Sequence, residues 1–309
     1  MGDGTGIEWT DATWNPVRGC TRISEGCRNC YAEHVAARFS GPGQPYEGLA
    51  KWVGKDARWT GKLAFVEKVL DQPRRWRRPR RIFVNSMSDL FHESMPVEWI
   101  DRVFAEMALA NWHTFQVLTK RSDRMRDYLS APDLHERLSA IMLDIARPGA
   151  WVMQVCSMSH IWLGASVEHQ AAADERREAM ASIAKMGWIT WASYEPALGP
   201  VDWTGWEFLR WLVAGGESGP GARPSHPAWH RAARDFCAAH GIAFLFKQWG
   251  NWIEAIPGFG THWCSAVGAH REKGYGVWAS DVEVVRVSKE KAGRLLDGVQ
   301  HDGYPEVAA

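Results

Sequence analysis

The sequence predicts an α/β fold, a TIM-like (β/α) barrel that is partial, with about six or seven parallel strands and a C-terminal appendage. Short apolar runs rich in β-branched and aromatic residues alternate with longer segments of helical periodicity. Strands that alternate with helices pair in parallel through right-handed crossovers, which favours one barrel over two domains. The strand candidates are IEWTDATWN (7–15), RIFVN (81–85), FQVL (115–118), IWLGAS (161–166), WITWAS (188–193), WLVAGG (211–216) and AFLFKQ (243–248).

Three segments between these runs are expected to be helices. Residues 96–111 place an apolar stripe of Val97, Ile100, Phe104 and Met107 on one helical face. Residues 174–187 end at a glycine. The third segment begins at Ser225, a residue type that caps helix N-termini, and stops at Gly241.

The strand–helix rhythm stops near the end of the last strand candidate. We therefore expect the barrel to occupy residues 1–255 and a C-terminal appendage to occupy residues 256–309. The segment 132–160 is longer than a crossover requires, which indicates an insertion.

Composition limits the class of protein. The chain has 309 residues, and its 36 basic and 36 acidic side chains give no global indication of a nucleic-acid or membrane partner. No apolar run approaches the roughly 20 residues needed to span a bilayer. The N-terminus lacks the apolar core of a signal peptide. These features predict a cytoplasmic protein with no membrane partner, whose thiols stay reduced.

Charged residues follow nearly every strand candidate. In a parallel barrel the carboxyl ends of the strands share one face, and active sites are built there. The alternative is that loops begin at these points and loops are polar. The residues concerned are Asp89, Lys120, Arg121, Glu168, Glu195, Glu217 and Lys247.

Three cysteines, Cys20, Cys27 and Cys30, lie within GCTRISEGCRNCYAEH, directly after the first strand candidate. Thiolates favour soft metals, so zinc and an iron–sulfur cluster are both candidates, against three unrelated buried thiols. Zinc would take His34 as its fourth ligand. A [4Fe–4S] cluster held by three cysteines would leave one iron open, as radical S-adenosylmethionine (SAM) enzymes require.

The other cysteines are scattered along the chain. Cys237 lies on an expected helix and is predicted to face the core, whereas Cys156 and Cys264 belong to no motif.

Seven segments are shared with a family of phage and prophage proteins. They are IEWTDATWNPVRGCTRISEGCRNCYAE, VNSMSDLFHE, LTKR, GASVE, ASYEPALGPV, GGESGPGARP and FLFKQWG. The chain resembles this family, which carries a three-cysteine motif and has no known function, over residues 7–252. More distantly, the layout is similar to the radical SAM superfamily, with Tyr31 beside the last cysteine. Spore photoproduct lyase, a DNA-repair member of that superfamily, offers a functional analogy. The six-residue gap after Cys20 departs from the usual C-x3-C-x2-C spacing of the superfamily.

The superfamily resemblance implies roles for several strand-end residues. Ser86, Ser88 and Asp89 would hold the amino group of SAM, and Lys120 or Arg121 its carboxylate. The resemblance would place Ser166 and Glu168 at the ribose, and Gly215 and Gly216 at the adenine. Glu195 and Glu217, which follow two later strands, are further cofactor-binding candidates.

A basic segment, RRWRRPRR (74–81), suggests a partner. Arginine neutralises phosphates and tryptophan stacks on bases, so this segment is a candidate nucleic-acid contact, although a charge run is often only a solvated face. It precedes a strand, which places it away from the predicted active face. The residues are Arg74, Arg75, Trp76, Arg77, Arg78, Arg80 and Arg81.

Three hypotheses follow. The first is a radical SAM enzyme that generates a 5′-deoxyadenosyl radical, with nucleic acid as a candidate substrate. The second is a zinc-stabilised module that binds nucleic acid or a phage or host protein without catalysis. The third is a regulator or toxin of the host cell.

Overall fold

A parallel sheet of seven strands organises the chain in the computed structural model, which describes residues 4–145, 158–255, 275–278 and 282–306. The strand order is β1-β6-β7-β8-β9-β10-β11, so β1 and β11 are end strands and the sheet is open. The predicted partial (β/α) barrel is therefore confirmed. The strands are β1 (Ala12–Trp14), β6 (Arg81–Val84), β7 (Thr114–Thr119), β8 (Ile161–Ser166), β9 (Ile189–Tyr194), β10 (Trp211–Gly215) and β11 (Ala243–Gln248).

The chain divides into two compact units. The first contains residues 1–165 and 178–190, and the second contains residues 166–177 and 191–306. The predicted domain boundary at residue 255 stays a prediction. None of the described helices is both long enough and apolar enough to cross a bilayer.

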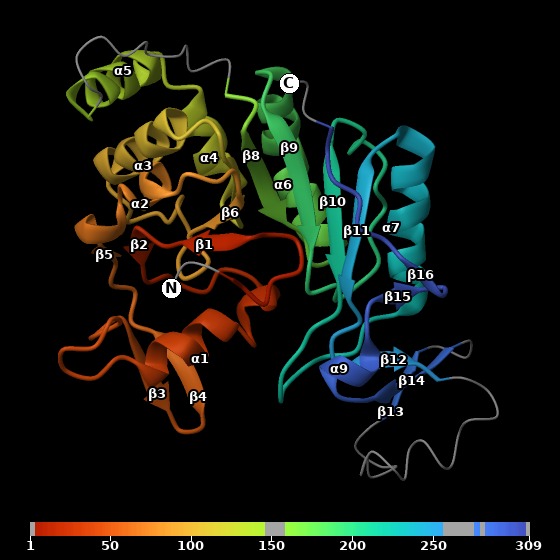
Figure 1. The fold of residues 1–309 in the computed structure, drawn as a ribbon. Helices are drawn as coiled ribbons and strands as arrows, with labels where there is room; N and C mark the ends of the chain where they lie inside the picture. The colour runs from red at the N-terminus through yellow and green to blue at the C-terminus, as the bar shows by residue number, and fades with distance from the viewer. Residues whose placement is uncertain (1–3, 146–157, 256–274, 279–281, 307–309) are drawn as a thin grey trace. The chain divides into compact units, whose positions relative to one another are not determined.

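The first unit carries a long excursion between β1 and β6. It holds β2 (Val17–Arg18), the 3-10 turn η1 (Glu25–Cys27), α1 (Tyr31–Arg38) and the hairpin of β3 (Ala50–Val53) and β4 (Asp56–Trp59). Figure 1 shows α1 beside this hairpin, and Ala36, Tyr46 and Ala57 are buried between them. The excursion ends with β5 (Ala64–Phe65), the 3-10 turn η2 (Glu67–Val69) and α2 (Gln72–Arg75).

Three further helices follow β6 and β7 in the first unit. They are α3 (Val97–Leu109), α4 (Ser122–Leu129) and α5 (Leu134–Ile145). Three residues of the expected apolar stripe of α3, Ile100, Phe104 and Met107, are fully shielded from solvent. The fourth, Val97, is 41% exposed, because it lies at the first position of the helix. The helix α5 lies in the predicted insertion at 132–160.

The second unit contains α7 (Pro227–His240) beside β10 and β11, whereas α6 (Gln170–Lys185) runs from the second unit into the first. The helix α6 begins earlier than the predicted residue 174. The helix α7 ends as predicted at Gly241, which has a left-handed φ of 66°. The predicted cap at Ser225 is wrong, because His226 caps α7 and accepts a hydrogen bond from the Ala228 amide. The Ser225 hydroxyl instead bonds the His230 ring at 2.7 Å.

A small antiparallel sheet follows β11. Its strands are β12 (Trp252–Glu254), β14 (Val282–Arg286) and β13 (Tyr275–Trp278), in that order. The remaining elements are α9 (Lys289–Ala292), β15 (Leu295–Leu296) and β16 (Val299–Gln300). Beyond β16, the chain returns to β11, where the Phe246 amide donates to the His301 carbonyl at 3.0 Å. This return covers an edge that would otherwise expose unpaired backbone groups.

Candidate cysteine site and strand-end clusters

Three free thiols lie on the chain between β2 and α1. Cys20 follows β2, Cys27 is the last residue of η1, and Cys30 is the N-cap of α1. All three are half-buried and none forms a disulfide. Their predicted position after the first strand is therefore confirmed.

Gly19 brings Cys20 close to the end of β6. Its amide donates to the Met87 carbonyl at 3.2 Å, and its φ is 97°, which favours glycine. A Cβ at this position would meet the Lys62 carbonyl oxygen at 2.1 Å. The sequence therefore needs glycine immediately before the first cysteine.

The surroundings of the thiols favour the protonated form when no cation is bound. Burial, followed by the nearby Asp89 carboxylate, raises the pKa of the Cys20 thiol to about 12, although Arg121 opposes this. Burial also raises the pKa of Cys30. A metal ion deprotonates a coordinating thiol, so three thiols in a short loop are a suitable donor set for a soft metal.

The thiols do not form a closed metal cage in this structure. Within the described residues, no group of three or more His, Cys, Asp or Glu side chains has an arrangement that could hold a metal ion. The cysteines therefore fit a metal by the chemistry of their sulfur donors, and their role as ligands stays a prediction. His34, the alternative zinc ligand, is exposed on α1, and its ring centroid lies 5.8 Å from that of Trp52.

The chain after β6 supplies the first group of predicted cofactor ligands. The Ser86 hydroxyl donates to the Asn15 side-chain oxygen at 3.1 Å, and the Ser88 hydroxyl donates to the Val17 carbonyl at 3.0 Å. Both serines therefore lie against the turn that joins β1 to β2. The Tyr31 hydroxyl donates to the Ser86 carbonyl at 2.8 Å, which ties the start of α1 to the same place.

Asp89 is the centre of a buried hydrogen-bond cluster. One carboxylate oxygen accepts from the Phe91 amide at 2.9 Å and from the Thr119 hydroxyl at 2.7 Å. The other accepts from the Lys120 amide at 3.2 Å and from the Arg121 guanidinium at 2.9 Å. The structure thus brings Asp89, Lys120 and Arg121 together at the carboxyl ends of β6 and β7, as predicted.

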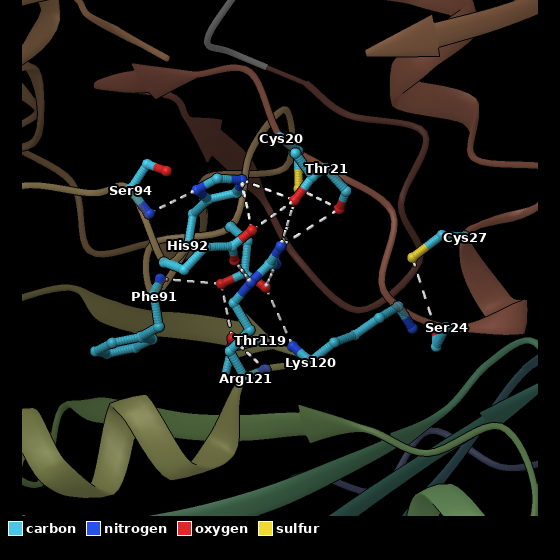
Figure 2. Close-up of polar contacts among 12 residues, drawn as sticks. Cys20, Thr21, Ser24, Cys27, Phe91, His92, Ser94, Thr119, Lys120 and Arg121 are labelled. Atoms are coloured by element: carbon cyan, nitrogen blue, oxygen red, sulfur yellow. Dashed lines mark hydrogen bonds and ion pairs between the residues drawn. The ribbon is translucent and has the colours of Figure 1, made fainter. Parts of the chain in front are cut away.

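Arg121 extends this cluster toward the cysteine loop (Figure 2). Its Nε donates to Glu93 Oε2 at 2.6 Å, and its Nη2 donates to the Thr21 hydroxyl at 2.8 Å. Its Nη1 lies 4.0 Å from Cys20 Sγ. Sequence reasoning missed Thr21, Glu93 and Thr119, although Thr21 adjoins Cys20 and Thr119 adjoins the predicted basic pair.

Another group of candidates lies in the second unit. Glu168 is fully buried, and its Oε2 accepts from Arg176 Nη1 at 2.7 Å. The same Arg176 Nη1 also donates to the Ser166 carbonyl. The predicted ribose ligand Glu168 therefore already belongs to a closed ion pair, whose partner the sequence did not reveal.

Two more carboxylates of the second unit have protein partners. Glu195 binds Lys247 Nζ at 2.9 Å and Gln248 Nε2 at 3.0 Å. Glu217 accepts from the side chain of Arg223 at 2.6 and 2.9 Å, and from its backbone amide at 2.8 Å.

Of the two glycines at the end of β10, Gly216 is needed for packing of the chain itself. A Cβ on Gly216 would meet the Trp249 carbonyl oxygen at 2.1 Å, so backbone packs directly on backbone there. A Cβ on Gly215 would lie 3.5 Å from the Glu195 carboxylate. At Gly216 the backbone therefore packs on another part of the chain, and the predicted adenine contact of these two glycines stays a prediction.

The arginine-rich segment is largely engaged with the protein. Arg74 binds Glu106 at 2.5 Å, Arg75 binds Asp71 at 3.2 Å, and Arg81 binds Asp11 at 3.1 Å. The Arg80 guanidinium lies 4.8 Å from the centre of the Trp76 ring. Arg77 and Arg78 are exposed.

Two of the remaining cysteines, Cys156 and Cys264, lie outside the described residues. Cys237 is fully buried on α7, so its predicted core position is confirmed.

Known proteins were compared with the chain by sequence and by fold. No curated protein matches it. Among solved structures, spore photoproduct lyase complexed with dinucleoside spore photoproduct shows 12% identity and a TM-score of 0.40, covering 94% of this chain and 72% of that chain. A doubly substituted mutant of that lyase with bound AdoMet and dinucleoside spore photoproduct gives the same values. A mutant of the lyase in which phenylalanine replaces one tyrosine gives 11% identity and a TM-score of 0.37, with the same coverage.

A similarity at this level does not assign an activity. A family model described as "Protein of unknown function (DUF5131)" matches residues 4–305. The chain therefore belongs to the DUF5131 family.

Proposed function

We propose that Cys20, Cys27 and Cys30 hold a [4Fe–4S] cluster and that the protein is a radical SAM enzyme. The observation that carries this proposal is the placement of three free, half-buried thiols beside a buried polar cluster, where two parallel strands end. Active sites of (β/α) barrels occur at that end of the strands. With SAM, such a cluster supplies hydrogen-atom abstraction through a 5′-deoxyadenosyl radical.

The residues after β6 and β7 would bind and orient SAM. The hydroxyl oxygens of Ser86 and Ser88 keep lone pairs that can accept from the SAM amino group. Lys120 is the proposed cation for the carboxylate, and the Arg121 guanidinium binds Asp89, Glu93 and Thr21. Asp89 acts by holding the start of α4 and Arg121 in place.

In the second unit, Glu195 is the carboxylate best suited to bind a further polar group of the cofactor. Its side chain is 16% exposed, whereas that of Glu168 is fully buried. The other proposed residues around the cofactor are Ser166, Glu168, Gly215, Gly216 and Glu217. Glu168 and Glu217 would keep their ion pairs with Arg176 and Arg223.

Anaerobic metal analysis tests the proposal. The purified protein should contain about four irons per chain and show visible charge-transfer absorption. After reduction in the presence of SAM, it should release 5′-deoxyadenosine. A colourless protein with a single zinc would instead support the zinc module that includes His34.

Nucleic acid is the proposed substrate class. Arg75, Arg77 and Arg78 are the exposed arginines of the basic segment, and Arg75 is paired with Asp71. We therefore propose Arg77 and Arg78 as the residues that make phosphate contacts. Replacing both with alanine should weaken binding of a DNA oligonucleotide and reduce its dependence on salt. Binding that does not respond to salt would contradict phosphate contacts. The association with phage and a cytoplasmic location are part of the same proposal.

A further inference from the structure

We propose that Arg121 is a positioning residue that anchors the start of the cysteine loop and orients Cys20 as a cluster ligand. This inference rests on the proposed function. It gives Arg121 a role different from the expected contact with the SAM carboxylate, because its donors already bind protein groups.

The guanidinium joins three parts of the first unit. It binds Asp89 just after β6 at 2.9 Å, Glu93 further along the same loop at 2.6 Å, and Thr21 at 2.8 Å. Its own backbone follows β7, and the Arg121 amide donates to the Thr119 hydroxyl at 2.9 Å. One side chain thus fixes the residue next to Cys20 relative to the ends of β6 and β7 (Figure 2).

Thr21 is held by a complete set of hydrogen bonds. The Ser94 amide donates to His92 Nδ1 at 3.1 Å, so the neutral imidazole carries its proton on Nε2. That Nε2 lies 2.8 Å from the Thr21 hydroxyl, which in turn donates to Glu93 Oε1 at 3.0 Å. The hydroxyl therefore accepts from Arg121 and His92 and donates to Glu93.

Low exposure makes this anchor strong. The side chains of Arg121 and Asp89 are each only 9% exposed, so their charged hydrogen bonds face little competition from water. A bidentate or forked set of contacts also requires the planar guanidinium, which a lysine ammonium does not reproduce.

The next residue connects the same loop to the helix that carries Cys30. Arg22 donates to both carboxylate oxygens of Glu33, a residue of α1 with a side chain only 1% exposed. Glu33 also accepts from the Trp59 amide at 3.1 Å. Thr21 and Arg22 therefore connect the ends of β6 and β7 to α1. Cys20 directly precedes these two residues in the sequence.

Arg121 also lies close enough to influence the sulfur itself. Its Nη1 is 4.0 Å from Cys20 Sγ, whereas the sulfur of Cys27 lies 3.7 Å from the Ser24 hydroxyl. Hydrogen bonds and nearby charges at cluster sulfurs alter the reduction potential. A positive charge at Cys20 should stabilise the reduced cluster and raise its potential.

The test uses four variants of the full chain. Arg121→Gln removes the charge, and Arg121→Lys keeps the charge without the fork. Thr21→Val removes the hydroxyl without leaving a buried charge unpaired, so this variant should fold. It therefore tests the inference even if the Arg121 variants do not fold. Arg126→Gln is the matched control, since Arg126 lies on α4 and binds Asp123 and Asp127.

Each variant is measured with and without iron. Hydrogen exchange of the Gly19 amide, which donates to the Met87 carbonyl at 3.2 Å, is followed in the metal-free protein. Iron retention against a chelator and the midpoint potential are measured after anaerobic reconstitution. Loss of a residue that orients a ligand typically lowers metal affinity by about 10–100-fold.

We expect faster exchange and faster iron loss in Arg121→Gln and Thr21→Val, and a more negative potential in Arg121→Gln alone. Arg121→Lys should restore the potential but not the slow exchange, and Arg126→Gln should match the wild type. Wild-type exchange and iron retention in both Arg121→Gln and Thr21→Val would overturn the inference. A wild-type chain that holds no iron would overturn the proposed function; faster exchange in its Arg121→Gln variant would then show a purely structural anchor.

Discussion

The strand ends of the two units carry similar charged residues but use them differently. In the second unit, Glu168 with Arg176 and Glu217 with Arg223 form closed pairs, and the first pair is almost entirely buried. In the first unit, the pair of Asp89 and Arg121 continues through Thr21 to a loop with three free thiols. A charged residue after a strand is therefore weak evidence for a site, whereas a buried pair that continues to reactive groups is stronger evidence.

The largest expected difference between the units concerns metal content. Cys30→Ala should lower iron retention by about tenfold or more, because even residues that only orient a ligand contribute that much to affinity. Cys237→Ala, at a fully buried thiol of the second unit, should keep the iron. Iron per chain after anaerobic reconstitution measures both. Equal iron content in the two variants would remove the functional distinction between the regions.

The second difference concerns stability. Glu168→Ala leaves the buried Arg176 charge unpaired, which should lower the free energy of unfolding by about 3–5 kcal/mol. Urea denaturation of the metal-free protein measures this loss. The control is Glu67→Ala, which removes an exposed partner of Arg102 and should cost less than about 1 kcal/mol. A small effect at Glu168 would mean that this pair does not stabilise the second unit.

The smallest expected effect is a pH dependence in the first unit. Burial tends to raise the pKa of Glu93, but hydrogen bonds from its own amide and from Arg121 lower it from 4.5 to about 2. A carboxyl whose pKa is lower in the folded state stabilises the protein above its unfolded pKa, and this contribution disappears as pH falls toward the folded value.

Glu93→Gln should therefore be less stable than the wild type near neutral pH, and the difference should shrink as pH falls from 4.5 to about 2. The free energy of unfolding at several pH values measures the difference. A difference that stays constant over this range would show that the carboxylate of Glu93 does not stabilise the anchor of Arg121.

Much of the fold could be predicted from local sequence. Runs such as IWLGAS and AFLFKQ are strands over the predicted residues, because buried parallel strands require continuous apolar side chains. Helix ends were less predictable, as α7 shows. There His226, with Pro227 at the first helical position, competes successfully with Ser225 for the cap.

The candidate site could be predicted only in part. The cysteine loop and the charged strand ends are visible as local patterns, so Cys20, Asp89 and Arg121 were found. Glu93 and Thr21 were missed, because nothing in their immediate sequence indicates that they share a guanidinium. The packing at Gly216 was not predicted either, because its neighbour is the Trp249 carbonyl, which follows another strand.

The sequence by itself determined the order of strands and helices and the position of the thiols after the first strand. It also determined which charged residues lie at the strand ends. These features depend on periodicity and spacing, which are local. Only the tertiary structure decided which charged residues form ion pairs with each other and which ion pair lies beside a thiol. Arg121 is 101 residues from Cys20 along the chain, and side chains that far apart meet only because parallel strands bring their ends together.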